Sequence, residues 1–100
     1  MDAYTRSFTL ERADEAELFH CMQEAAGEDA DRRGGGMDAL FAKGLAWVLL
    51  WQCLDIVRRP AAGEQLRIVT MPGKGRLGLY PRRFELWSGD ECIGAARSVW

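Results

Sequence analysis

A chain of 100 residues with 48% apolar residues and a net charge of −2 forms one domain with a thin core. The slightly acidic charge argues against nucleic acid as a partner, and no apolar run reaches the ~18 residues of a membrane span. Three widely spaced cysteines lack metal-ligand spacing and the N-terminus lacks an apolar signal segment. We therefore expect no metal, no cofactor and a reducing, cytoplasmic location.

The first part of the chain predicts a strand followed by a long helix. Residues 4–10 alternate between apolar and polar side chains, as a half-exposed strand does. Asp14 and Glu17 have the spacing of a capping box, and apolar or small residues then recur at helical spacing. We expect a helix over residues 15–32, ended by three glycines, and one or two helical turns over 37–42. The inner face of the long helix is mostly small, so we expect a sheet to approach it closely.

The second part predicts four strands in succession, at residues 45–58, 66–71, 77–87 and 92–100. Turns rich in glycine and proline separate them. Pro81 indicates an edge position or a bulge for the third of these strands, because proline cannot donate to a sheet ladder. One helix inserted between a first strand and an antiparallel meander is an α+β layout.

Residues 45–58 are the most informative segment. Between Ala46 and Ile56 the single charged side chain is Asp55, so both faces of this strand are apolar. Such a pattern is typical of a central strand that is covered on both sides. The lone helix can cover one side, and we expect the other to be covered by a ligand or by a second copy of the chain.

Five short strings, in order along the chain, resemble the N-terminal half of acyl-acyl-carrier-protein thioesterases. They lie at residues 22–28, 44–49, 59–64, 84–86 and 94–100. The resemblance implies one hotdog domain over residues 1–100, in which an antiparallel sheet wraps around one long helix. Since family strands continue with several apolar residues, the last strand either is cut at Trp100 or ends early in this protein.

The resemblance also implies a ligand and an assembly. The ligand would be a fatty acyl thioester of carrier protein or coenzyme A. The assembly would be a homodimer or a higher oligomer that buries residues 45–57 and 92–100. However, family members carry two hotdog halves, and their catalytic Asp, Asn and His belong to the second half, which nothing here matches. The chain is therefore either a thioester hydrolase or a non-catalytic acyl-binding or assembly module.

Three residues are candidates for catalysis. Asp14 lies where the long helix begins, where free amides and the helix dipole suit an oxyanion, although helix capping also explains it. Glu24 falls in mid-helix, where some hotdog thioesterases place a catalytic carboxylate, but a structural pair of Gln23 and Glu24 that hydrogen-bonds to backbone across the sheet also explains it. His20 is the only histidine and could act as a base or simply face solvent.

Two further groups are candidates for ligand contacts. Four arginines at predicted strand ends would suit the phosphates of coenzyme A or an acidic carrier protein, or merely protect a solvated sheet edge: Arg58, Arg59, Arg82 and Arg83. Trp47, Leu49 and Trp51 alternate along the apolar strand and would line an acyl pocket, or else contribute to a core or a subunit contact.

Overall fold

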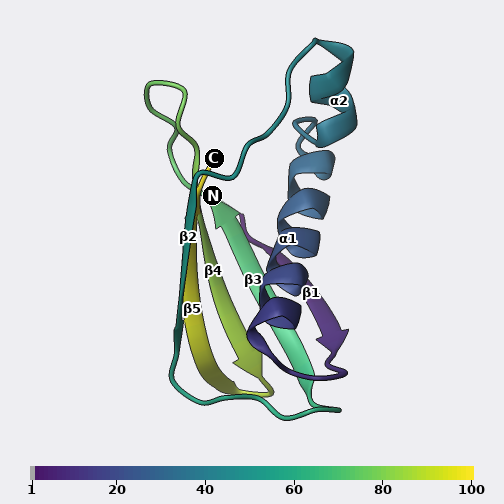
Figure 1. The fold of residues 1–100 in the computed structure, drawn as a ribbon, viewed down its shortest axis with the longest axis vertical. Helices are drawn as coiled ribbons and strands as arrows, with labels where there is room; N and C mark the ends of the chain where they lie inside the picture. Colours follow the sequence, from purple (N-terminus) through teal and green to yellow (C-terminus); the bar gives the residue numbers. More distant parts are fainter. Residues whose placement is uncertain (1) are drawn as a thin grey trace.

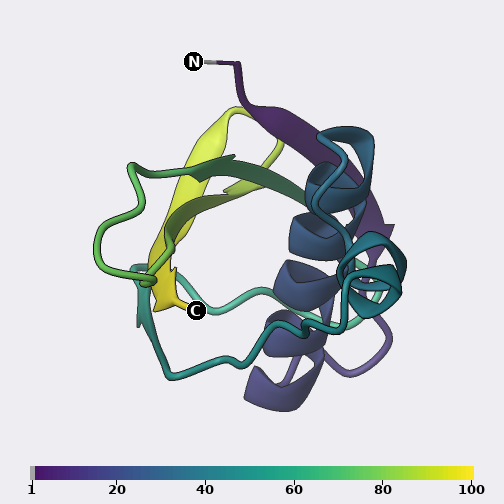
Figure 2. The same ribbon diagram turned by 90° about the horizontal axis from the view of Figure 1, so that it is seen from above.

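The computed structural model describes residues 2–100, which form one antiparallel sheet with a long helix on its concave side (Figures 1 and 2). The elements are β1 (Tyr4–Thr9), α1 (Glu15–Arg32), α2 (Met37–Ala42), β2 (Trp51–Ile56), β3 (Gln65–Pro72), β4 (Pro81–Ser88) and β5 (Glu91–Val99). The strand order is β1-β3-β4-β5-β2, and every neighbouring pair is antiparallel. The predicted α+β class and the sheet wrapped around one helix are confirmed. Neither helix has the length and hydrophobicity that crossing a membrane requires.

The helix α1 begins and ends where the sequence predicts. The Asp14 carboxylate accepts a hydrogen bond from the Glu17 amide at 2.9 Å, which satisfies one of the free donors of the first turn. The Glu17 carboxylate turns back and accepts from the amides of residues 11–13, at 2.7 to 2.9 Å. The connection between β1 and α1 is therefore fixed by two acidic side chains, although Glu17 reaches past the capping residue itself.

The hydrophobic core lies between α1 and the sheet, and it is concentrated near the N-terminal end of α1. Its fully buried large side chains come from the β1–α1 loop, α1, β3, β4 and β5: Leu10, Leu18, Met22, Leu66, Ile68, Phe84, Leu86 and Ile93. On the strands these residues alternate with more exposed ones, as expected for a sheet with one covered face. Burial of this set accounts for most of the hydrophobic stabilisation.

The strand predicted over residues 45–58 is wrong in length and in position. Regular pairing covers only β2, which lies at the edge of the sheet beside β5. Because β5 ends at Val99, opposite Trp51, residues 45–50 have no strand to pair with beyond a single bond from the Leu50 amide to the Val99 carbonyl. These residues instead form an extended connection to α2, with Leu50 and Val48 more than half exposed.

The strand predicted over residues 77–87 begins later, at Pro81. Residues 73–80 form a hairpin loop that projects beyond the sheet (Figure 1), closed by a bridge between Arg76 and Leu79. The edge position inferred from Pro81 is wrong, since β4 lies between β3 and β5. Proline is accepted there because it is the first residue of the strand. A register irregularity does occur in β4, but at Leu86/Trp87.

Candidate functional site

A cavity of about 490 Å³ lies between the C-terminal half of α1 and the end of the sheet where β4 begins. The helix contributes Ala26, Gly27 and Ala30 to its wall, and these side chains are too small to fill the space. The other lining residues are Gln23, Arg33, Gly35, Gly36, Met37, Trp47, Pro72, Gly73, Tyr80, Pro81, Arg82 and Trp100. The close approach of the sheet that the sequence predicts is therefore wrong here, because the stripe of small residues leaves a mostly apolar cavity.

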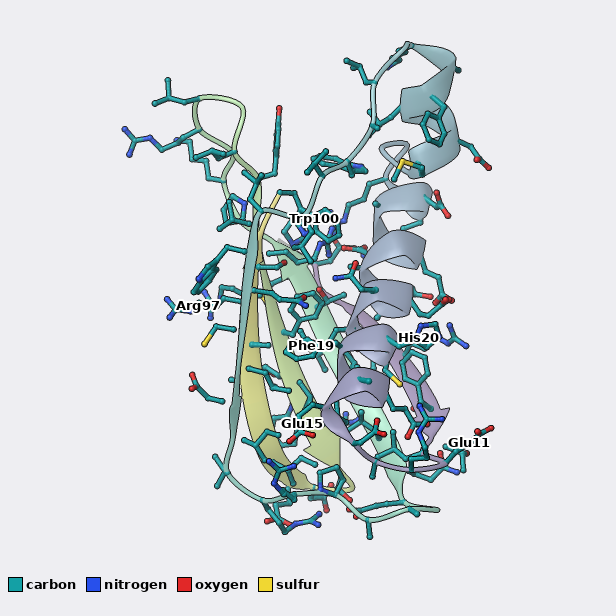
Figure 3. All side chains as sticks on the ribbon, in the orientation of Figure 1. Glu11, Glu15, Phe19, His20, Arg97 and Trp100 are labelled. Carbon is teal, nitrogen blue, oxygen red and sulfur yellow. The ribbon has the colours of Figure 1, made fainter. Side chains whose placement is uncertain are left out.

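One wall of the cavity is aromatic. The Trp47 ring meets Tyr80 and Trp100 edge to face, with ring centroids 5.2 and 6.4 Å away. The Trp47 indole N–H donates to the Gly35 carbonyl at 2.7 Å, and the Trp100 indole donates to the Ser98 hydroxyl at 3.0 Å. Figure 3 places Trp100 between the sheet and α1. The hydrogen bonds hold both indole rings in place, so the wall is largely preformed.

Two other lining residues, Arg33 and Arg82, belong to an ionic cluster centred on Asp29, whose side chain is fully buried. One carboxylate oxygen accepts from Arg82 at 2.7 Å, and the other accepts from the Nε atoms of Arg32 and Arg33 at 2.6 and 3.0 Å. Arg82 also donates to the Thr70 hydroxyl at 3.2 Å. Burial alone would raise the pKa of Asp29, but the hydrogen bonds from the three guanidinium groups outweigh it and lower that pKa.

The three predicted catalytic residues lie outside the cavity wall. Asp14 caps the far end of α1, and the Glu17 amide, followed by Arg12, lowers its pKa. His20 and Glu24 lie on the outer side of α1, 3.7 Å apart between Nε2 and Oε1, and Figure 3 shows His20 pointing away from the sheet. Their catalytic roles stay predictions.

The helix turns the neighbour of Glu24 inward instead. Gln23 lines the cavity, and its side-chain amide donates to the Gln52 side chain of β2 at 3.3 Å. This hydrogen bond connects α1 to the edge strand β2. Sequence reasoning paired Gln23 with Glu24, whereas a helix rotates consecutive residues by about 100° and so separates them.

The four predicted ligand-binding arginines do not form one cluster. Arg58 bonds to Glu64 at 2.7 Å and Arg59 pairs with Glu15 at 2.6 Å, near the N-terminal end of α1. Arg82 is buried in the cluster around Asp29, while Arg83 is exposed on the outer face of the sheet. Alternation along β4 sends these last two neighbours to opposite faces.

The predicted aromatic row is also divided. Trp47 lines the cavity, but Leu49 and Trp51 do not. Trp51 is 47% exposed on the outer face, where the Arg97 guanidinium lies 5.8 Å from its ring. Because residues 45–50 are not a regular strand, the expected two-residue alternation does not continue through them. Tyr80, which sequence reasoning missed as a site residue, takes a place in the wall instead.

Solved structures, but no family model or curated sequence, are similar to this chain. No protein-family model matches the sequence, and no curated protein sequence matches it. An acyl-ACP thioesterase from Bacteroides thetaiotaomicron is similar over 98% of this chain and 44% of its own, with 26% identity and a TM-score of 0.93. A protein described as an oleoyl thioesterase from Lactobacillus plantarum is similar over 99% of this chain and 42% of its own, with 19% identity and a TM-score of 0.92.

A shorter protein shares the same fold. A 1,4-dihydroxy-2-naphthoyl-CoA thioesterase from Synechocystis is similar over 98% of this chain and 80% of its own, with 13% identity and a TM-score of 0.82. The chain thus spans less than half the length of the first two proteins and most of the third. The structure confirms the resemblance to acyl-ACP thioesterases that the sequence indicates, and the chain has the hotdog fold that these thioesterase structures share.

Proposed function

We propose that this chain binds the acyl group of a fatty acyl thioester, of carrier protein or coenzyme A, in the cavity beside Trp47. The observation that carries the proposal is the cavity itself, because its volume of about 490 Å³ and its mostly apolar wall suit an acyl group. The similarity to thioesterase structures supports the same ligand class.

Hydrolysis needs more than this chain offers at the cavity. Attack on a thioester requires a carboxylate or an activated water near the carbonyl, together with donors for the oxyanion. Among residues 2–100, the charged side chains in the wall are Arg33 and Arg82, and no carboxylate lines it. We therefore assign acyl binding to this chain, and we expect hydrolysis to depend on catalytic groups from a different hotdog half, which a second copy of this chain does not supply.

The free edge of the sheet supports pairing of two copies of this chain. β2 is an edge strand, and unpaired strand edges bind other strands readily. Apolar side chains are exposed along it and beside it, including Leu50 at 58%, Trp51 at 47% and Val57 at 82%. A homodimer joined at β2 would bury this surface. Sedimentation velocity should give a dimer for the wild type and a monomer for Trp51→Glu.

Binding of lauroyl-coenzyme A, with free coenzyme A as the reference ligand, tests the acyl-binding function. Isothermal titration should show saturable binding of the acyl form alone, and Trp47→Ala should weaken it at least tenfold. The matched control is Trp87→Ala, which removes a tryptophan that does not line the cavity and lies on β4, separated from β2 by β5, so it should bind normally. Equal binding of both ligands, or binding of neither, contradicts the proposal.

Release of free thiol from lauroyl-coenzyme A tests whether this chain hydrolyses the thioester or only binds it. We expect no turnover by the purified chain above the rate of a heat-treated sample. Turnover that is lost in Glu24→Gln or Asp14→Asn, with binding retained, would contradict our assignment. It would make those residues part of a catalytic site, as the sequence interpretation considered.

A further inference from the structure

We propose that the cavity is built to receive a carboxylate, with Arg82 binding the anionic group and the aromatic wall packing against the apolar body of the same molecule. The ligand class is an apolar organic acid, either free or carried as an acyl group with a second, free carboxylate. The inference rests on the proposed acyl-binding function for its choice of cavity, and it narrows the ligand chemistry.

The covered face of the sheet changes character where the cavity begins. Near the N-terminal end of α1, the buried positions of β3, β4 and β5 are apolar. At the other end the same faces carry buried polar side chains, which are Thr70, Arg82 and Ser98. Since burial of a polar group is costly unless it is hydrogen-bonded, a polar set at one end of a covered face points to a ligand or an internal network there.

The internal network uses only one nitrogen of Arg82. The residue is 8% exposed, and Nη1 makes both of its hydrogen bonds, to Asp29 and to Thr70. No oxygen among residues 2–100 accepts a hydrogen bond from Nε or Nη2 of Arg82. Every fully buried side-chain nitrogen in the same part of the chain, however, has a hydrogen-bond partner. The two remaining nitrogens must therefore meet open space, and the open space beside Arg82 is the cavity that it lines.

These two nitrogens have the geometry that a carboxylate requires. Nε and Nη2 lie on one edge of the planar guanidinium, with parallel N–H bonds that bind both oxygens of a carboxylate. Desolvation inside the cavity strengthens such a charged pair relative to one in water. A lysine would offer a point charge there instead of a fork.

The charge balance also favours an anion. Asp29 shares its negative charge among Arg32, Arg33 and Arg82, and Asp2 pairs with the first two. Three guanidinium groups thus meet two carboxylates, which leaves the cluster with a net positive charge. Within the described residues, no acidic side chain lines the cavity to offset it. A bound carboxylate would neutralise the remaining positive charge of the cluster.

The decisive experiment compares octanoate with octanamide, which has the same length and an uncharged head group. Titration of the wild-type protein at pH 7, followed by calorimetry and tryptophan fluorescence, should give at least tenfold tighter binding of octanoate. Equal affinity overturns this inference while the proposed acyl binding stands. If neither octanoate, octanamide nor lauroyl-coenzyme A binds, the proposed function itself fails.

Variants assign the preference to Arg82. Arg82→Gln should remove the preference for octanoate, whereas Arg97→Gln, an exposed arginine on the outer face, should keep it. Because loss of Arg82 alone can unfold the protein, the double variant Asp29→Asn/Arg82→Gln removes both charges of this pair, leaves Arg32 and Arg33 their contacts with Asp2, and should show the same loss. A preference that persists in either folded variant overturns the role of Arg82.

A second comparison separates the two sources of the carboxylate. The thioester of coenzyme A with dodecanedioic acid carries a free carboxylate at the far end of its acyl group, and lauroyl-coenzyme A does not. Tighter binding of the first identifies a carboxyacyl thioester as the ligand. Equal binding of the two thioesters, together with a preference for octanoate over octanamide, identifies a free acid.

Discussion

The two ends of the space between α1 and the sheet are made from the same elements and are filled differently. Near the N-terminal end of α1, Leu18 packs with Phe84 and Leu86, and all three are almost completely buried. Near the C-terminal end, Ala30 and Gly27 leave a cavity of about 490 Å³. One end therefore supplies packing energy, and the other gives up packing and leaves open space.

The open end keeps its shape by other means. Instead of interdigitated apolar side chains, it has the hydrogen-bonded carboxylate of Asp29 and the indole rings of Trp47 and Trp100, each fixed by a hydrogen bond. Hydrogen bonds fix groups at set positions and so can keep a space between them open, whereas apolar side chains pack together until little space is left. The same helix thus stabilises the core with its first half and lines the cavity with its second half.

The largest effect is expected at the closed end. Phe84→Ala should lower the free energy of unfolding by about 4 kcal/mol, because it removes a fully buried ring and leaves a cavity. Urea denaturation measures the change, and Phe41→Ala, at an exposed phenylalanine, should change it by less than ~0.5 kcal/mol. A loss below ~1 kcal/mol for Phe84→Ala would mean that the closed end is not tightly packed.

The open end should depend on Asp29 for stability. Asp29→Ala leaves buried or half-buried guanidinium groups without their shared partner, so we expect a loss of about 3 kcal/mol. Asp31→Ala, at an exposed acidic residue two positions along the same helix, is the control in the same urea experiment. Equal effects of the two substitutions would refute the idea that charge pairing maintains this end.

The closed end should weaken in acid through Glu64, which joins the start of β3 to Arg58. The Arg58 guanidinium, then the Ser88 hydroxyl and the Ala61 amide, lower the pKa of Glu64 to about 2. Because the folded-state pKa lies below the ordinary value of 4.5, the stabilisation is complete above pH 4.5 and is lost as the pH falls toward 2. The difference in stability between wild type and Glu64→Gln, measured by thermal unfolding, should shrink over this range. A constant difference would show that Glu64 acts without its charge.

The smallest effect on stability, and the sharpest on binding, should come from filling the cavity. Ala30→Leu adds apolar volume where space is open, so the free energy of unfolding should change by less than ~1 kcal/mol. Binding of lauroyl-coenzyme A should nevertheless fall at least tenfold. Ala16→Leu, the same substitution on the exposed face of α1, should bind normally. Unchanged affinity in Ala30→Leu would place the acyl group elsewhere.

Some site residues follow sequence periodicities that a reading by residue type overlooks. Arg82 has the same strand parity as Phe84 and Leu86, so alternation alone places it on the covered face. Asp29 follows Met22 and Ala25 at helical spacing and so falls on the inner stripe. The position of Arg82 was missed because the arginines were grouped by charge. The position of Asp29 was missed because the inner stripe of the helix was treated as apolar or small.

The sequence by itself determined the local structure: the bounds of α1, its capping by Asp14, and the alternation of β3 and β5 all follow from side chains close in the chain. Only the tertiary structure decided where β2 begins, because strand pairing stops where the partner strand β5 stops. It also decided the cavity, which lies between residues as distant as Ala30 and Trp100. Volume and charge at such a site depend on which side chains meet across the fold, and no local pattern specifies that.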